Sequence, residues 1–167
     1  MEESIIYVDA DATAGEETGE SWDDAYTDLQ DAIKNAPFGS QIWVAQGTYT
    51  PTAGTDREVS FEVPNGVQIY GGFTGEETSL NQRDVTANTT TLSGDIGVTG
   101  NSSDNSVHVV NISDTSNSSV LDGFTISDGN ADDFSLGNDG AGIYGERSQA
   151  ILSNLIISNN SATNSGG

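Results

Sequence analysis

One segment of this chain occurs twice, and the repetition restricts the fold more than any other feature of the sequence. Residues 120–131 read VLDGFTISDGNA and residues 151–162 read ILSNLIISNNSA, at an offset of 31 residues throughout. Apolar positions in one copy match apolar positions in the other, and the corners between them hold Asp, Gly, Ser or Asn. Such repetition is typical of stacked architectures, in which a unit buries its apolar face only against a neighbour. We therefore expect the two copies to be successive coils of a parallel β-helix.

The rest of the chain supplies the short strands that such coils need. Strands of a hairpin sandwich are separated by turns every ~8–12 residues, whereas the apolar runs here are shorter and fit a coil with three faces. Stacked coils would place equivalent strands ~4.8 Å apart in parallel register. The interruptions at 51–57, 74–88, 97–106 and 131–139 are polar and are expected to be loops. The predicted strands are 5–9, 42–44, 59–63, 67–70, 90–92, 107–112, 120–121, 124–126, 141–144, 150–152 and 155–157.

Polar side chains at the corners of the coils are expected to bond along the axis of the stack. Asn159 and Asn160 occupy a corner of the second copy, and Asp128 and Gly129 occupy the same corner one coil earlier. Because equivalent side chains lie directly above one another in stacked strands, amide groups there form ladders.

One amphipathic helix is predicted, from residue 22 to about residue 35. Ser21 precedes it as a cap, Asp24 follows three residues later, and Pro37 and Gly39 end it. Such a helix would cover the exposed end of the first coil, which otherwise invites association. We therefore divide the chain into residues 1–40, with a strand, an acidic loop and the capping helix, and residues 41–167, the coils. The apolar stripe of the helix comprises Trp22, Ala25, Tyr26, Leu29, Ala32 and Ile33.

The charge of the chain excludes several classes of partner. Four Lys and Arg oppose 26 Asp and Glu, which gives a net charge of −22. A field of this sign repels nucleic acid and anionic lipid. No run of 18 apolar residues is present, so membrane insertion is not expected, and without Cys the chain has no disulfide or thiolate site.

Several segments resemble secreted right-handed parallel β-helix repeat proteins of bacteria. Gly140–Tyr144 and Ile156–Asn159 are similar to the Gly-Gly-Ala-Ile and Phe-x-x-Asn repeats of polymorphic outer-membrane-protein-like passengers, although Ala141 interrupts the glycine pair and Ile156 replaces Phe. The resemblance implies a right-handed β-helix and a secreted, cell-surface location. The same fold is shared with pectate-lyase-like enzymes, so it does not by itself decide the activity. The N-terminal half carries the resemblance at residues 6–12, 21–32, 41–49, 66–78 and 92–97.

The residues give little support to catalysis. A polysaccharide lyase of this fold needs a basic residue beside calcium-binding carboxylates. Lys34 lies on the predicted helix, Arg57 lies in a loop, and Arg83 and Arg147 have no acidic cluster at a fixed spacing. A hydrolase needs paired carboxylates, which cannot be located from the sequence. The single histidine, His108, lies in a β-run without zinc or triad spacing. The basic residues are Lys34, Arg57, Arg83 and Arg147.

Calcium is the one ligand that we predict from the acidic residues. Asp9 and Asp11 belong to one acidic loop, and Asp132, Asp133 and Asp139 to another. Carboxylates on flexible loops suit Ca²⁺, but the same residues also form Asx turns, and neither loop fits an EF-hand. Trp22, Trp43, Tyr49, Tyr70 and Phe73 could form a sugar-stacking surface, although their positions favour the core.

These observations favour a non-catalytic structural or adhesive segment of an extracellular cell-surface protein. A polysaccharide-active or carbohydrate-binding β-helix is the alternative. The last residues resemble the opening of a further coil, so we expect a segment of a longer solenoid whose uncovered end self-associates end to end. Possible partners are a second copy, a surface glycan or a surface protein.

Overall fold

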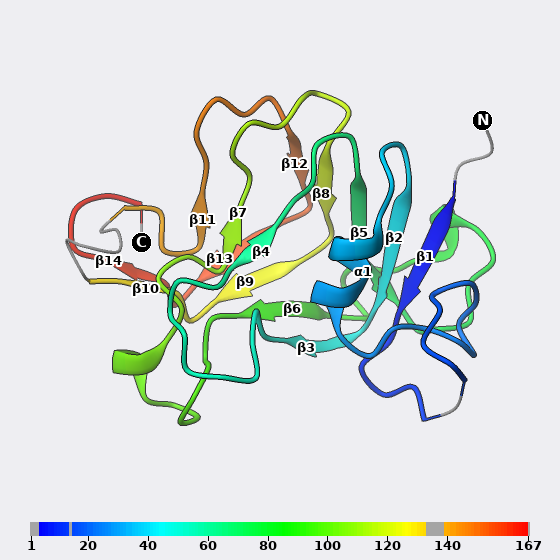
Figure 1. Cartoon of the computed structure of the whole chain (residues 1–167), viewed down its shortest axis with the longest axis horizontal. Coiled ribbons are helices and arrows are strands. Elements are labelled where there is room, and N and C mark those ends of the chain that lie inside the picture. Colours follow the sequence, from blue (N-terminus) through cyan, green and yellow to red (C-terminus); the bar gives the residue numbers. More distant parts are fainter. Residues whose placement is uncertain (1–3, 14, 133–138, 167) are drawn as a thin grey trace.

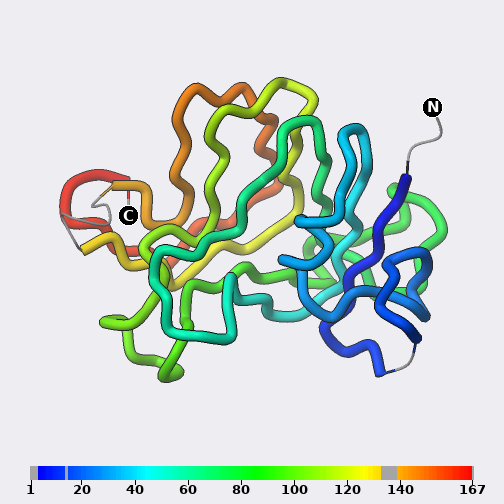
Figure 2. Tube along the Cα trace, viewed as in Figure 1, coloured from blue at the N-terminus to red at the C-terminus, as the bar shows by residue number. Residues whose placement is uncertain are grey.

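The computed structural model describes residues 4–13, 15–132 and 139–166. Within them the chain forms an all-β parallel β-helix with one α-helix at its N-terminal end, which confirms the predicted fold class. The strands of the described residues pair in parallel, and strands far apart in sequence lie side by side (Figure 1). Figure 2 shows the chain winding through successive coils, with loops projecting between them.

The largest sheet holds one strand from each coil. We number the coils 1 to 5 in the order of these strands. Its order, β1-β2-β5-β8-β12, is the order in which the labels run across Figure 1. The five strands are β1 (Ile5–Val8), β2 (Gln41–Ala45), β5 (Gln68–Phe73), β8 (Val120–Asp122) and β12 (Ile151–Ser153).

The remaining faces of the coils form three smaller sheets. The second has the order β13-β9-β6-β3, the third β11-β7-β4, and the fourth pairs β10 with β14. Two short 3₁₀ helices, η1 (Leu80–Gln82) and η2 (Ser102–Asp104), lie in segments predicted as loops. The strands are β3 (Gly47–Tyr49), β4 (Phe61–Glu62), β6 (Thr90–Ser93), β7 (Val110–Asn111), β9 (Thr125–Ser127), β10 (Asn130–Ala131), β11 (Ile143–Tyr144), β13 (Ile156–Ser158) and β14 (Ser161–Ala162).

The repeated segment folds in the register that its sequence predicts. Leu121 pairs with Leu152, Ile126 with Ile157, and Ala131 with Ala162, all at the offset of 31 found in the sequence. The predicted stacking of the two copies as coils 4 and 5 is confirmed. The third strand of the repeat was missed, because β10 and β14 are two-residue strands of Asn-Ala and Ser-Ala without an apolar run.

The core lies inside the coils and is built in columns. Ile6, Ile42, Ile69 and Leu121 occupy equivalent inward positions of the largest sheet, and each is buried. Burial of one such side chain contributes about 1.5–3 kcal/mol. The stacking of like residues thus joins the coils into one hydrophobic cluster.

The helix is shorter than predicted. Only Leu29–Asn35 forms α1, and Asp28, whose side chain accepts a hydrogen bond from the amide of Gln30, caps it in place of Ser21. The preceding residues instead extend the largest sheet, since the amide of Tyr26 donates to the carbonyl of Tyr7 at 3.0 Å. The prediction of a helix over 22–28 is wrong because Tyr26 pairs with β1, while the amides of Asp24 and Ala25 donate to carbonyls only three residues back, as in turns.

The N-terminal end of the β-helix is closed. Leu29, Ala32 and Ile33 of α1 are buried in the core, and the helix contacts β1, β2 and β4. The outer edge of β1 is bonded to Gly19 and Tyr26. The segment 1–40 therefore shares the sheet and the core of the coils that follow.

Among the described residues, none covers coil 5 in this way. Leu152 and Ile157 are 42% and 50% exposed, although their equivalents in coil 4, Leu121 and Ile126, are 1% and 0% exposed. The two side chains keep the inward positions of the repeat, and the open face of coil 5 is consequently apolar.

Corner side chains do bond between coils: Asp128 accepts from the hydroxyl of Ser93 in coil 3 at 3.2 Å, and Asn160 bonds to the backbone of coil 4. The Asn160 Oδ1 accepts from the amide of Gly129 at 2.8 Å, and its Nδ2 donates to the carbonyl of Ile126 at 3.0 Å. Asp128 and Asn159 have φ values of 64° and 57°, in the left-handed region that Asn and Asp tolerate. The predicted coil-to-coil role holds for Asn160, whereas Asn159 serves as a turn residue.

Candidate functional site

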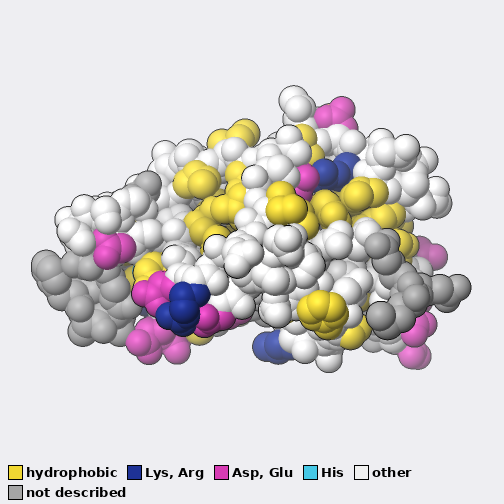
Figure 3. Space-filling view, turned by 90° about the horizontal axis from the view of Figure 1, so that it is seen from above, with side chains coloured by type: hydrophobic (Ala, Val, Ile, Leu, Met, Phe, Trp, Pro, Cys, Tyr) yellow, Lys and Arg dark blue, Asp and Glu magenta, His cyan; other side chains and the backbone are white. Residues whose placement is uncertain are grey.

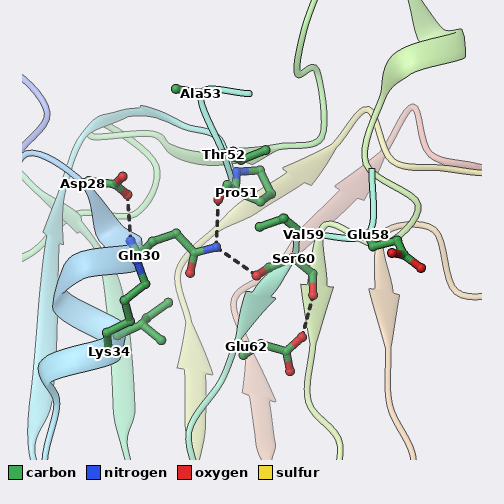
Figure 4. A pocket seen from close by; sticks show the side chains of 11 residues that line it. Asp28, Gln30, Lys34, Pro51, Thr52, Ala53, Glu58, Val59, Ser60 and Glu62 are labelled. Atoms are coloured by element: carbon green, nitrogen blue, oxygen red, sulfur yellow. Dashed lines mark hydrogen bonds between the residues drawn. The ribbon is translucent and has the colours of Figure 1, made fainter. Parts of the chain in front are cut away.

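One hollow lies between α1 and the connection that joins β3 to β4 (Figure 4). Its volume is about 450 Å³. Its lining combines apolar side chains with polar groups. The lining residues are Asp28, Gln30, Ile33, Lys34, Pro51, Thr52, Ala53, Glu58, Val59, Ser60 and Glu62.

Gln30 fixes the two walls of this hollow to each other. Its Nε2 donates to the carbonyls of Pro51 at 2.8 Å and Ser60 at 2.9 Å, as Figure 4 shows. Both amide hydrogens of the side chain are therefore used within the protein. The walls of the hollow are held by the fold and need no ligand to take this shape.

Three carboxylates face this hollow with little positive charge beside them. Glu62 accepts from the hydroxyl of Ser60 at 2.7 Å, while Lys34 pairs with Asp31 at 3.4 Å. Asp28 is engaged as the helix cap and Glu58 is exposed. The arrangement offers hydrogen-bond acceptors to a neutral or cationic ligand and repels an anionic one.

The most buried ion pair joins Arg83 to Asp122. Arg83 Nη2 lies 2.9 Å from Asp122 Oδ1, and the side chains of Arg83 and Asp122 are 14% and 13% exposed. Arg83 also donates to the carbonyl of Gly71 and lies over the ring of Tyr70, 5.2 Å from its centroid. Arg83 follows β5 and Asp122 ends β8, so this pair ties coil 3 to coil 4.

The environment of Asp122 favours its charged form. Burial raises the pKa of the carboxyl, but hydrogen bonds from Asn154, Ser153 and Arg83 outweigh burial and lower the pKa below its usual value. Asn154 and Ser153 belong to coil 5, so a single carboxylate connects three coils.

The two remaining arginines also connect coils. Arg57 of coil 2 donates at 2.7 Å to the carbonyls of Asn105 and Asn130 and to Asp132. Arg147 of coil 4 pairs with Asp114 of coil 3 at 2.6 Å. Figure 3 likewise shows basic side chains beside acidic ones on the face that it presents, along with a band of hydrophobic side chains. Each of the three arginines thus connects two different coils through an ion pair.

The predicted calcium residues are placed separately or in other contacts. Asp9 accepts from the amide of Asp11 at 3.0 Å, which is an Asx turn. Asp132 pairs with Arg57, and Asp139 accepts from Asn164 and Ser165. Asp133 lies outside the described residues. Within the described ranges, no group of three or more His, Cys, Asp or Glu is arranged to hold a metal ion, and calcium at these residues stays a prediction.

The aromatic residues form a second apolar cluster outside the coils. Trp43 and Phe73 stack at 4.8 Å, and Tyr7 and Trp22 pack against them. Trp43 and Phe73 are 2% and 0% exposed, since loops cover this face of the largest sheet. Of the aromatic residues expected in the core, Tyr49 belongs to the core inside the coils. Trp43, Tyr70 and Phe73 are buried in this second cluster, which the sequence did not reveal, and Trp22 is partly buried beside them.

Glu77 holds one of these covering loops. Its carboxylate accepts from the amides of Thr74, Gly75 and Glu76, and its carbonyl accepts from Trp22 Nε1 at 2.9 Å. Burial raises the pKa of Glu77, and these hydrogen bonds outweigh burial and lower it. Glu77 thus explains how a polar loop closes over aromatic rings.

His108 has a packing role. Its ring stacks on Tyr144 with 4.7 Å between centroids, and its Nδ1 lies 3.1 Å from the carbonyl oxygen of Gly140. Both partners belong to coil 4, whereas His108 precedes β7 of coil 3. The residue is a further contact between coils.

Comparison with known proteins gives one match. The family described as "Protein of unknown function (DUF1565)" matches residues 13–165. No curated protein and no solved structure gives a significant match. In the described part of the chain, no helix is long and apolar enough to cross a membrane.

Proposed function

We propose that this chain, which belongs to the DUF1565 family of β-helix-like proteins, is a non-catalytic structural segment of an extracellular cell-surface protein. The coils form a stiff support, and the loops between them form the surface that meets a glycan, a protein or a second copy. The resemblance to secreted bacterial repeat proteins supports the location.

The observation that carries this proposal is the use of the basic side chains. Arg57, Arg83 and Arg147 each bind an acidic residue of another coil, and Lys34 pairs within α1. Charge-assisted hydrogen bonds of Arg to carboxylates are among the stronger polar contacts. Positive charge that a lyase would place beside its substrate is therefore committed to holding the stack together.

The location is tested on intact cells of the source organism. An antibody raised against this chain should label the cells without permeabilisation, and external protease should remove the signal. A cytoplasmic protein, assayed in the same cells, is the control for leakage. Labelling that requires permeabilisation would refute the cell-surface location.

The alternative is a carbohydrate-active or carbohydrate-binding site in the hollow of Figure 4. Glu58 and Glu62 with Asp28 are its carboxylates. We expect no release of reducing ends when the chain is incubated with neutral and acidic polysaccharides, and no binding to them in calorimetry. Activity or binding that is lost in the double variant Glu58→Gln/Glu62→Gln and retained in Glu76→Gln, on another loop, would replace the structural proposal.

A further inference from the structure

A second, smaller hollow of about 210 Å³ lies at the corner of three successive coils. Coil 3 supplies Asp95 and Asn105, coil 4 supplies Asp128 and Asn130, and coil 5 supplies Asn159 and Ser161. Every residue that lines it is Asp, Asn, Ser or Gly. The hollow is therefore built from oxygen-bearing groups, with no apolar side chain in its lining.

Asn105 presents an acceptor that the described residues leave unsatisfied. The residue is 6% exposed, and its Nδ2 donates to the carbonyl of Asp128 at 2.6 Å. This contact fixes the orientation of the amide, because the opposite orientation would place two carbonyl oxygens against each other. The Asn105 Oδ1 then has no hydrogen-bond partner among the described residues. A buried acceptor without a partner costs about 1–3 kcal/mol, so such an atom indicates a bound water or ion.

The neighbouring residues in the chain show the same deficit. Asp104 Oδ1 and Ser106 Oγ are also buried without a partner in the described structure. Three consecutive residues with unsatisfied oxygens are unusual, since most buried polar side-chain atoms have at least one partner.

Two carboxylates border the hollow without a basic partner. Asp95 accepts from the amide of Gly100 at 2.9 Å, and Asp128 accepts from the hydroxyls of Ser93 and Ser127 through one oxygen. Neither carboxylate forms an ion pair with Lys or Arg in the described ranges. The negative charge at this corner is consequently uncompensated by the protein.

We propose that this corner binds one hard divalent cation of the Ca²⁺ class. Ca²⁺ takes six to eight oxygens from carboxylates, Asn carbonyls, backbone carbonyls and waters. Asp95, Asp128, Asn105 and Asn159 offer the first two kinds of oxygen, and water completes the coordination. Because the ligands come from coils 3, 4 and 5, the bound cation joins the three coils and stabilises the stack through its binding free energy.

The site differs from the calcium residues that the sequence suggested. Asp9, Asp11, Asp132 and Asp139 do not line this hollow. Asp11 and Asp139 therefore provide matched controls, because replacing either carboxylate with an amide lowers the net negative charge by the same amount as replacing Asp95. The proposed cation site depends only on the residues that line the hollow, whatever the function of the protein.

The test is calorimetric titration of the chelator-treated protein with CaCl₂ at ~150 mM salt, an ionic strength that screens surface charges beyond about 8 Å. We expect one saturable site for Ca²⁺, weaker binding of Mg²⁺, and an increase in Tm that EGTA reverses. Asp95→Asn, which keeps an acceptor for Gly100, should weaken Ca²⁺ binding by about tenfold or more because one ligand charge is lost. Asp11→Asn and Asp139→Asn should change the affinity less than about twofold, since they alter only the distant field.

Each other outcome contradicts the site. A titration without saturable heat, together with a Tm that Ca²⁺ does not change, would mean that water satisfies Asn105. Equal losses in Asp95→Asn and Asp139→Asn would mean that Ca²⁺ binds the acidic surface diffusely. Asp128→Asn provides a second variant at the site, and circular dichroism of each variant separates lost binding from lost folding.

Discussion

At the scale of single residues, Asp122 illustrates how this chain uses charge. Its carboxylate accepts hydrogen bonds from Arg83, Ser153 and Asn154. The side chain is 13% exposed, so these contacts are shielded from solvent. Asp114 also makes a short contact with Arg147, at 2.6 Å, but the Asp114 side chain is 64% exposed. Two ion pairs with similar geometry should therefore contribute very differently to stability.

Asp122→Asn should destabilise the fold by about 1–3 kcal/mol at pH 7, because Arg83 loses its charged partner. The folded pKa of Asp122 lies below its usual value of 3.8, so the contribution is complete above pH ~4 and is lost as the pH falls through the folded pKa. Urea unfolding from pH 7 to pH 2.5 should show the variant losing less stability below pH 4 than the wild type does. Asp114→Asn is the control and should unfold nearly as the wild type does at pH 7. Equal effects of the two substitutions would contradict the assigned burial.

Two glycines with the same backbone conformation make a second residue-scale comparison. Gly123 and Gly39 have φ values of 88° and 87°, but a Cβ on Gly123 would lie 2.7 Å from Val85 and 2.9 Å from the carbonyl of Gly71. No atom lies within 4 Å of a Cβ on Gly39. Gly39→Ala should cost about 1–2 kcal/mol from backbone strain, and Gly123→Ala about 1–3 kcal/mol more from overpacking. Thermal unfolding of both variants measures the difference, and similar Tm values would refute it.

At the scale of elements, α1 stabilises the fold by covering the first coil. Leu29 is 1% exposed within the core, whereas the Lys34 side chain is 71% exposed. Leu29→Ala should destabilise the protein by about 2–5 kcal/mol, and Lys34→Ala should remain within about 0.5 kcal/mol of the wild type. Urea unfolding followed by Trp fluorescence checks both values. A small effect of Leu29→Ala would mean that α1 contributes little to closing the core.

The same helix marks the limit of sequence-based prediction for an element. Trp22, Ala25, Tyr26 and Leu29 have helical spacing, and nothing in their pattern shows that Tyr26 pairs with β1. The choice depends on Gly19 and Tyr7, whose contacts form only in the folded chain. Period and turn chemistry predict the repeated coils well, because coil 5 repeats the sequence pattern of coil 4. Unique segments such as 22–28 are decided by contacts that no pattern records.

The candidate sites were harder still to predict from the sequence. The corner hollow combines Asp95, Asn105, Asp128 and Asn159, which come from coils 3, 4 and 5 and lie far apart in the sequence. The sequence indicated Asp128 and Asn159 as equivalent corners, since they share the 31-residue offset. Asp95 follows β6, Asn105 lies in the loop 97–106, and neither belongs to the repeated segment, so their place at the corner required the structure.

At the scale of the whole molecule, the two ends of the β-helix are unequal. The N-terminal end is closed by α1 and by the bonds of Gly19 and Tyr26 to β1. At the other end β12 and β13 are the outermost strands of their sheets, and Leu152 and Ile157 are exposed. A head-to-tail filament would need both ends open, so association of this chain should stop at a dimer joined through coil 5.

The net charge determines when this dimer forms. Two copies of a chain with a net charge of −22 repel each other, and salt screens that repulsion, with a Debye length of about 10 Å at 0.1 M and about 3 Å at 1 M. Sedimentation velocity should therefore show a dimer fraction that rises with NaCl concentration, without larger species. Ile157→Lys should abolish the dimer by placing a charge on the apolar face, whereas Val98→Lys, at an exposed apolar residue of a loop, should not. Because Ile157→Lys lowers the net negative charge and thus weakens repulsion, a monomeric Ile157→Lys variant points to the lost apolar contact. A dimer that survives in this variant, or filaments at high salt, would place the contact elsewhere.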